Sequence, residues 1–124
     1  MSKTPPRGTK FVEGKGLWCR RDGDRIVVGI TPPLLAEMRG TPFVEILGKG
    51  TTVYKGEAVG LVQSARGHEL EIESPVSGEL VDVNPDLPDD TSAINKDPYG
   101  RGWLFQIVPS DPDEWSSPDL GEER

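Results

Sequence analysis

Two side chains with recognition chemistry, Arg66 and His68, are separated only by Gly67 and lie between two runs of β-favouring residues. An arginine guanidinium is a planar fork of donors that suits bidentate contact with a carboxylate or a phosphate, and a histidine changes its charge near neutral pH. Both residues could therefore belong to a recognition element. The alternative is that they are solvated residues of a turn made by Gly67.

Three glutamates follow directly, Glu69, Glu71 and Glu73. Because side chains alternate between the two faces of a strand, these three share one face of an extended segment. Such an acidic stripe could meet a basic partner surface. A solvated strand face accounts for it equally well, since like charges on alternate residues discourage edge-to-edge aggregation.

No residue set in the sequence has the spacing of a catalytic or metal site. The single cysteine, Cys19, lies in a candidate strand, where a buried small apolar residue is expected rather than a nucleophile. One cysteine and one histidine cannot build a zinc site, and the sequence has no glycine-rich phosphate loop and no serine–histidine–aspartate order. We therefore expect no catalytic residue, no metal and no enzyme activity.

The 124 residues carry 14 Lys and Arg against 21 Asp and Glu, a net charge of −7. A chain of this length is most simply one domain, and its acidity argues against nucleic acid as a partner. Its first ten residues lack the apolar run of a signal peptide, and no run approaches the roughly 18 apolar residues that a membrane span needs. We expect a cytoplasmic protein that does not engage a membrane.

Short strand-like runs follow one another between turn-forming residues. Residues 17–21 and 25–30 flank an Asp-Gly turn and predict a hairpin, and Thr31-Pro32-Pro33 predicts one short helix after residue 31. Further strands are expected at 42–47, 58–64, 69–74, 79–84 and 102–108. The pattern indicates an all-β sandwich or barrel.

The chain divides into three segments. Residues 1–10 are expected to be a disordered N-terminal arm, residues 11–110 the domain, and residues 111–124 a short helical turn followed by a frayed acidic tail. Trp115 is expected to dock that turn on the domain, and Tyr99 and Trp103 to serve the core and its closing turn.

The stretch 58–74 predicts a hairpin with one solvated face, because Leu70 and Ile72 alternate with the three glutamates. Its tip is the tetrapeptide Ala65-Arg66-Gly67-His68. The chain should reverse again at residues 75–78, where proline and Ser-Gly form a turn.

Two segments resemble the H protein of the glycine cleavage system: residues 75–84, Pro-Val-Ser-Gly-Glu-Leu-Val-Asp-Val-Asn, and residues 95–104, Asn-Lys-Asp-Pro-Tyr-Gly-Arg-Gly-Trp-Leu. The likeness extends over about residues 16–110. It implies a mostly β barrel-sandwich hybrid of the lipoyl/biotinyl type, two small sheets packed face to face. It also implies a small carrier whose lipoyl arm shuttles an aminomethyl group between partner enzymes.

This sequence departs from the family at the lipoyl lysine, which the family places at the hairpin tip. The corresponding residues are Gln63-Ser64-Ala65-Arg66, and the count of eight residues back from Pro75 reaches Gly67. The six lysines, at positions 3, 10, 15, 49, 55 and 96, all lie outside residues 58–74. Arginine has no amine suited to the lipoyl amide. We therefore interpret the tip as a degenerate lipoyl-site hairpin and expect no cofactor; its residues are Ser64, Ala65, Arg66, Gly67 and His68.

The resemblance and the missing lysine together predict a non-catalytic binding or regulatory module, monomeric or weakly oligomeric. Its expected partner is a protein, with a glycine-cleavage or lipoate-metabolism enzyme as the candidate. The partner-binding residues would be Arg66, His68, Glu69, Glu71 and Glu73. Two alternatives remain open: a genuine carrier of glycine decarboxylation with its cargo at an unrecognised site, and a structural subunit of an unrelated complex.

Overall fold

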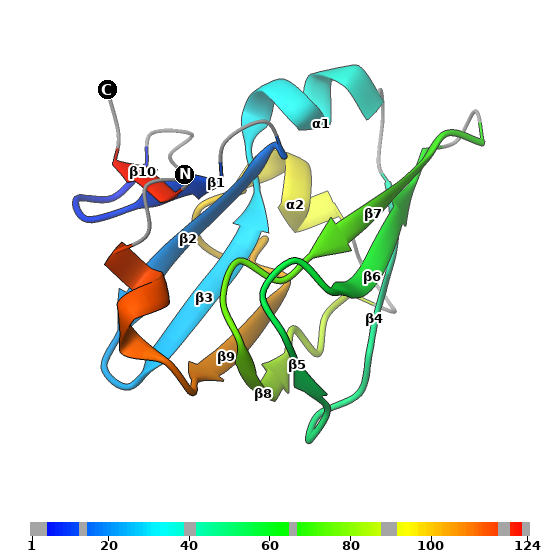
Figure 1. Ribbon diagram of the computed structural model, residues 1–124. Coiled ribbons are helices and arrows are strands. Elements are labelled where there is room, and N and C mark those ends of the chain that lie inside the picture. The colour runs from blue at the N-terminus through cyan, green and yellow to red at the C-terminus, as the bar shows by residue number, and fades with distance from the viewer. Residues whose placement is uncertain are drawn as a thin grey trace.

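The hairpin expected around the Asp-Gly turn is present. Strands β2 (Leu17–Asp22) and β3 (Arg25–Ile30) pair along their whole length, and Gly23 has the positive φ, 65°, that the tight turn favours. The computed structural model in Figure 1 describes residues 5–12, 15–38, 42–64, 67–87, 92–116 and 120–122.

β2 and β3 lie at the centre of a seven-stranded antiparallel sheet with the order β10-β1-β2-β3-β9-β8-β5. The other members are β1 (Lys10–Val12), β5 (Thr52–Val53), β8 (Gly78–Val83), β9 (Phe105–Pro109) and β10 (Leu120–Glu122). The predicted strands at 79–84 and 102–108 correspond to β8 and β9, whereas β1, β5 and β10 were not predicted.

A second, three-stranded antiparallel sheet has the order β4-β6-β7. It consists of β4 (Phe43–Ile46), β6 (Ala58–Gln63) and β7 (Glu69–Glu73), which match three of the predicted strands. The β6–β7 hairpin reaches outward past the seven-stranded sheet, and β1 and β10 lie on the far side of the molecule (Figure 1). β7 is therefore an edge strand whose tip projects from the body.

The short helix predicted after residue 31 is α1 (Pro32–Met38). Thr31 directly precedes α1. The backbone N–H and the hydroxyl of Thr31 both donate to the Gly16 carbonyl, at 2.9 and 3.1 Å. These two bonds tie the start of α1 to the loop before β2. Two further helical segments follow, α2 (Ser92–Lys96) and the 3-10 turn η1 (Pro112–Ser116). α2 was not predicted, because its five residues are too short for a helical period to stand out.

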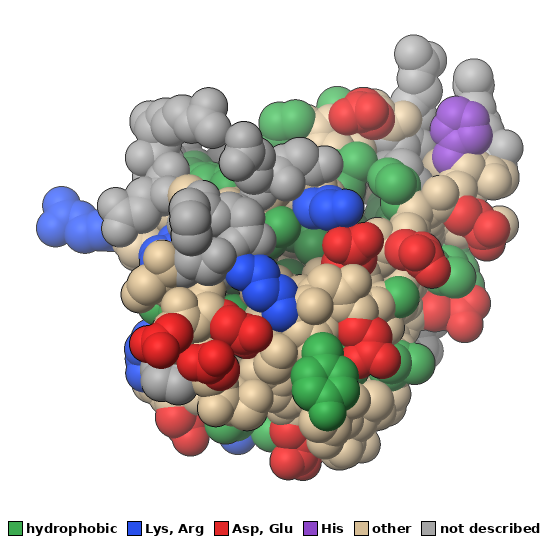
Figure 2. Space-filling model, in the orientation of Figure 1, with side chains coloured by type: hydrophobic (Ala, Val, Ile, Leu, Met, Phe, Trp, Pro, Cys, Tyr) green, Lys and Arg blue, Asp and Glu red, His purple; other side chains and the backbone are tan. Residues whose placement is uncertain are grey.

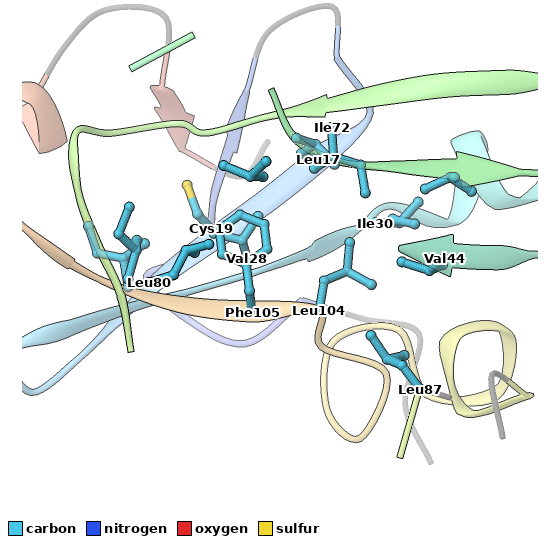
Figure 3. Close-up of a cluster of buried hydrophobic side chains, with 14 of the residues drawn as sticks. Leu17, Cys19, Val28, Ile30, Val44, Ile72, Leu80, Leu87, Leu104 and Phe105 are labelled. Carbon is cyan, nitrogen blue, oxygen red and sulfur yellow. The ribbon is translucent and has the colours of Figure 1, made fainter. Parts of the chain in front are cut away.

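The core lies between the two sheets. Figure 3 shows Cys19 and Val28 of the large sheet and Val44 and Ile72 of the small sheet in one buried cluster. This burial confirms the prediction for Cys19.

A smaller cluster occupies the opposite face of β2 and β3. There the Trp18 ring lies 5.6 Å from the Tyr99 ring, centroid to centroid, and the Trp18 indole N–H donates to the Pro98 carbonyl at 2.9 Å. Trp103 packs against the same cluster. The structural roles predicted for Tyr99 and Trp103 are therefore confirmed.

The two ends of the chain differ from the expectation. Lys10, assigned to a disordered arm, belongs to β1, and the tail expected to fray contains β10, which pairs with β1. The physical reason is that β1 would otherwise leave an edge of unpaired backbone groups, which β10 satisfies. The predicted helical turn is present as η1, and Trp115 packs against the core. Residues 1–4, 117–119 and 123–124 lie outside the described residues.

Candidate functional site

Hydrogen bonds to Ser64 close the turn between β6 and β7. The Ser64 N–H donates to the His68 carbonyl at 2.8 Å, and the His68 N–H donates to the Ser64 hydroxyl oxygen at 3.1 Å. Gly67 donates its N–H to the Ser64 carbonyl at 3.0 Å and has a φ of 87°, which favours glycine. Ser64 is buried, whereas Gly67 and His68 are exposed. The other two residues of the degenerate site, Ala65 and Arg66, lie outside the described residues.

The three glutamates of β7 alternate along the strand, but their environments differ. Glu69 and Glu71 are exposed, while Glu73 is partly buried and forms an ion pair with Lys15, with Nζ 3.3 Å from Oε1. Because both partners of this pair keep access to water, it contributes at most about 1 kcal/mol to stability. The acidic stripe thus has two exposed members and one that is partly buried and paired with Lys15.

Leu70 departs from the simple alternation. Ile72 is buried at 2% exposure, as an inward-facing residue should be, but Leu70 on the same face is 44% exposed. The reason is the reach of the hairpin: near its tip β7 extends past the end of the seven-stranded sheet, so the inner face of β7 has no core to cover it there (Figure 1). Leu70 is left as a large apolar side chain beside the acidic stripe.

An open cleft separates β7 from α1. It consists of two adjoining hollows of about 790 and 620 Å³, which share Leu34, Glu37, Glu69 and Leu70 in their walls. The first hollow extends to the hairpin tip at Gly67 and His68, and the second extends past Lys15 and Glu73. On this face of the molecule, acidic side chains gather along β7 (Figure 2). The hairpin residues and α1 together therefore form one acidic, partly apolar groove.

Sequence reasoning did not identify the wall of the cleft that faces β7, which is made by Lys15, Leu34 and Glu37. One signal for Glu37 existed, because it stands two residues after the buried Leu35 and so lies across the helix from it. Nothing in the sequence places that side of α1 opposite β7, because this arrangement depends on where α1 packs relative to the two sheets in the folded protein. The structure brings these residues together with Glu69, Glu71 and Glu73.

Within the described ranges, no three or more His, Cys, Asp and Glu side chains come together in a way that could hold a metal ion. In the same part of the chain, no helix has the length and apolar character needed to cross a bilayer. The β6–β7 segment, residues 58–74, contains no lysine in the printed sequence.

Comparison with known proteins identifies relatives along nearly the whole chain. The family model described as "Glycine cleavage H-protein" matches residues 9–123. The chain is 44% identical over 117 residues to the probable glycine cleavage system H protein of Aeropyrum pernix, covering 89% of this chain and 81% of that protein. It is 42% identical over 95 residues to the glycine cleavage system H protein of Anaeromyxobacter sp. strain K, covering 77% of this chain and 73% of the relative.

A solved structure agrees with these relatives. The crystal structure of a glycine cleavage system H protein from Mycobacterium marinum superposes with a TM-score of 0.74 at 33% identity, covering 85% of this chain and 86% of that one. This similarity confirms the predicted barrel-sandwich fold, with its two antiparallel sheets and few short helices. By family model, sequence and structure alike, the chain belongs to the glycine cleavage H-protein family.

Proposed function

We propose that this chain is an H protein without a lipoyl group on its hairpin, acting as a non-catalytic protein-binding or regulatory module. The observation that carries the proposal is the combination of an ordered hairpin frame and an altered tip. Ser64 and His68 close the turn by two hydrogen bonds, yet residues 58–74 contain no lysine.

The chemistry of the lipoyl attachment explains why the tip residues matter. Lipoate is held as an amide, which requires a primary amine on the side chain. None of the tip residues, Ala65, Arg66, Gly67 and His68, has a primary amine on its side chain. The arginine guanidinium stays charged and does not offer such an amine. The residues of this hairpin therefore do not fit the group, and the proposed function includes no step through it.

The partner that we propose is a glycine-cleavage or lipoate-metabolism enzyme, because the relatives in sequence and structure are named as glycine cleavage system H proteins. The contact residues would be Arg66, His68, Glu69, Glu71 and Glu73. Two observations support this surface: His68, Glu69 and Glu71 are exposed, and the acidic side chains line a cleft rather than a flat face. A cytoplasmic location is part of the same proposal.

The decisive experiment is a lipoylation assay on the intact chain. The purified protein is incubated with lipoate, ATP and a lipoate ligase, and its mass is measured before and after. We expect the unmodified mass, while a lipoyl domain that the ligase is known to modify, treated in parallel, serves as the positive control. A gain of one lipoyl group would contradict the proposal. Peptide mapping would then locate the modified lysine and identify a carrier with its cargo at another position.

A further inference from the structure

In the described part of the chain, β7 presents an unpaired edge to the cleft. In an antiparallel ladder, residues that exchange hydrogen bonds with the neighbouring strand alternate with residues that direct their backbone groups away from it. The Ser64 N–H donates to the His68 carbonyl, so His68 directs its backbone groups toward the β6 side, and the register pairs Leu70, two residues on, with Val62. Just after β7, the Ser74 N–H donates to the Glu57 carbonyl, so the even-numbered residues face the β6 side along the whole strand.

The odd-numbered residues of β7 are therefore the ones whose N–H and C=O groups point away from β6. These are Glu69, Glu71 and Glu73, the same residues that carry the acidic stripe. Within the described residues, β6 is the sole strand that pairs with β7. An edge of this kind is a ready template for an additional strand.

The cleft gives such a strand room and sets its side-chain pattern. A new strand would lie roughly 4.8 Å from β7, inside the cleft whose far wall is α1. Its side chains would alternate between the outer face, beside Glu69 and Glu71, and the inner face, beside Leu70 and Leu34. The outer positions favour basic side chains and the inner positions favour apolar ones.

Charge decides between possible occupants. Among the described residues, the lining of the cleft contains four carboxylates, on Glu37, Glu69, Glu71 and Glu73, and one ammonium, on Lys15. A second copy of this chain would place its own β7 glutamates against them, on a protein whose net charge is −7. Like charges directly opposite destabilise a strand pair, whereas basic residues stabilise it.

We propose that the edge of β7 binds an extended, basic segment of a partner protein, with alternating basic and apolar residues, as a fourth strand of the β4-β6-β7 sheet. The inference rests on the proposed protein-binding role and names the chemistry of the partner. The backbone of Glu69 and Glu71 supplies the hydrogen bonds, their side chains hold the basic residues, and Leu34 and Leu70 contact the apolar ones.

The first test measures binding of a defined probe to the full chain. The probe is a capped seven-residue peptide of alternating lysine and valine with a fluorescent label, and binding is followed by anisotropy at low salt. A peptide with glutamate in place of lysine is the control, and it should not bind. Failure of the lysine peptide to bind would overturn the inference, whereas the lipoylation assay, which uses no peptide, would still stand.

The second test asks whether the backbone edge is used. Amide hydrogen exchange is measured by NMR with and without saturating peptide. The amides of Leu70 and Ile72 are already bonded to β6, so we expect peptide to slow mainly the exchange at Glu69 and Glu71, by about tenfold or more. Binding without this slowing would overturn strand addition. Slowed exchange that depends on protein concentration without peptide would assign the edge to a second copy and would equally overturn the proposal.

A pair of variants at one position separates backbone from charge. Glu71→Pro removes an outward N–H and, at an edge strand, leaves the ladder to β6 intact, whereas Glu71→Ala removes only the carboxylate. We expect the proline variant to bind the lysine peptide about fivefold more weakly than the alanine variant, the effect of about one hydrogen bond. Equal affinities would contradict the inference. If the proline variant does not fold, the exchange measurement decides.

Discussion

Ser64 and His68 hold each other at the base of the hairpin tip: each donates its backbone N–H to an oxygen of the other, at 2.8 Å to the His68 carbonyl and 3.1 Å to the Ser64 hydroxyl. Neither bond uses the side chain of residue 66. These two bonds therefore do not depend on which side chain stands at position 66, and that side chain can be exchanged experimentally.

A lysine placed in this frame should restore an acceptor. Arg66→Lys and Gly67→Lys correspond to the two possible registers of the tip. We expect Arg66→Lys to be the better substrate, because a side chain at Gly67 meets no neighbour within 4 Å but must adopt a φ of 87°. Mass spectrometry after incubation with ligase, lipoate and ATP measures acceptance. If both variants remain folded by circular dichroism and neither is modified, the tip geometry itself has diverged from an acceptor.

The hydroxyl of Ser64 should matter for stability as well as for the turn. Ser64→Ala leaves the His68 N–H without this acceptor, and we expect a loss of about 1 kcal/mol in the free energy of unfolding. Urea denaturation measures the change. Ser116→Ala, at an exposed position, is the matched control and should lie within about 0.5 kcal/mol of the parent protein. A control that loses as much as Ser64→Ala would contradict the role given to the hydroxyl.

Charge on β7 should govern how fast a basic partner associates. In the triple variant Glu69→Gln, Glu71→Gln, Glu73→Gln, we expect the association rate with the proposed partner, tested with the decarboxylase of the glycine cleavage system, to fall about tenfold at low salt. The difference should disappear at 1 M salt, where the Debye length is about 3 Å. Stopped-flow fluorescence measures both.

The control for this experiment changes the net charge equally at exposed positions away from the cleft, with Glu79→Gln, Asp86→Asn and Asp113→Asn. If this control slows association as much as the β7 variant, the effect belongs to total charge. Unchanged kinetics in the β7 variant would leave the stripe as a solvated strand face.

Removing the lysine of the Lys15–Glu73 ion pair should strengthen the binding of a basic peptide, whereas removing glutamates weakens it. Lys15→Met removes the lysine that lines the cleft among the described residues, so the lysine–valine peptide should bind about two- to fivefold more tightly at low salt. The free energy of unfolding should fall by less than about 1 kcal/mol, because the pair is largely solvated. Lys49→Met, at an exposed position outside the cleft, should leave the affinity unchanged. Weaker binding by Lys15→Met would contradict the charge argument.

The large sheet has its own sensitive position at Gly29, which lies opposite Trp18 in the β2–β3 register. A Cβ at Gly29 would come within 2.5 Å of the Trp18 ring. We expect Gly29→Ala to lower the free energy of unfolding by about 1–3 kcal/mol, the usual range for overpacking. Gly48→Ala is the control, since a Cβ there meets nothing within 4 Å. Thermal unfolding followed by circular dichroism compares the two, and equal stabilities would show that the ring can shift.

Local patterns predicted the parts of the fold that local residues determine. The Asp-Gly turn gave the β2–β3 hairpin, the proline-led start gave α1, and the alternation in β7 gave its glutamate face. β10 was not predictable, because its three residues form a strand only by pairing with β1. The exposure of Leu70 was missed for a similar reason: its alternation is that of a buried residue, and only the arrangement of the sheets shows that nothing covers it.

The candidate site also combines features that local sequence determines with features that only the folded arrangement creates. The tip and the three glutamates could be identified from sequence, since they are contiguous. The groove could not, because Lys15, Glu37 and β7 come from three separate segments of the chain that meet only in the folded protein. The bond from Thr31 to the Gly16 carbonyl, which ties two of these segments together, has no signature in either segment alone.

The pairing of β1 with β10 orders events during synthesis on the ribosome. The β2–β3 hairpin can form as soon as residue 30 has emerged, and β1 can join it at once. The second edge of β1 must wait for its partner, since Lys10 pairs with Glu122. At elongation rates of about 5–20 residues per second, that edge stays uncovered for roughly 5–20 s in every nascent chain. Translation speed therefore sets how long each new molecule exposes a strand edge on which another chain could misassemble.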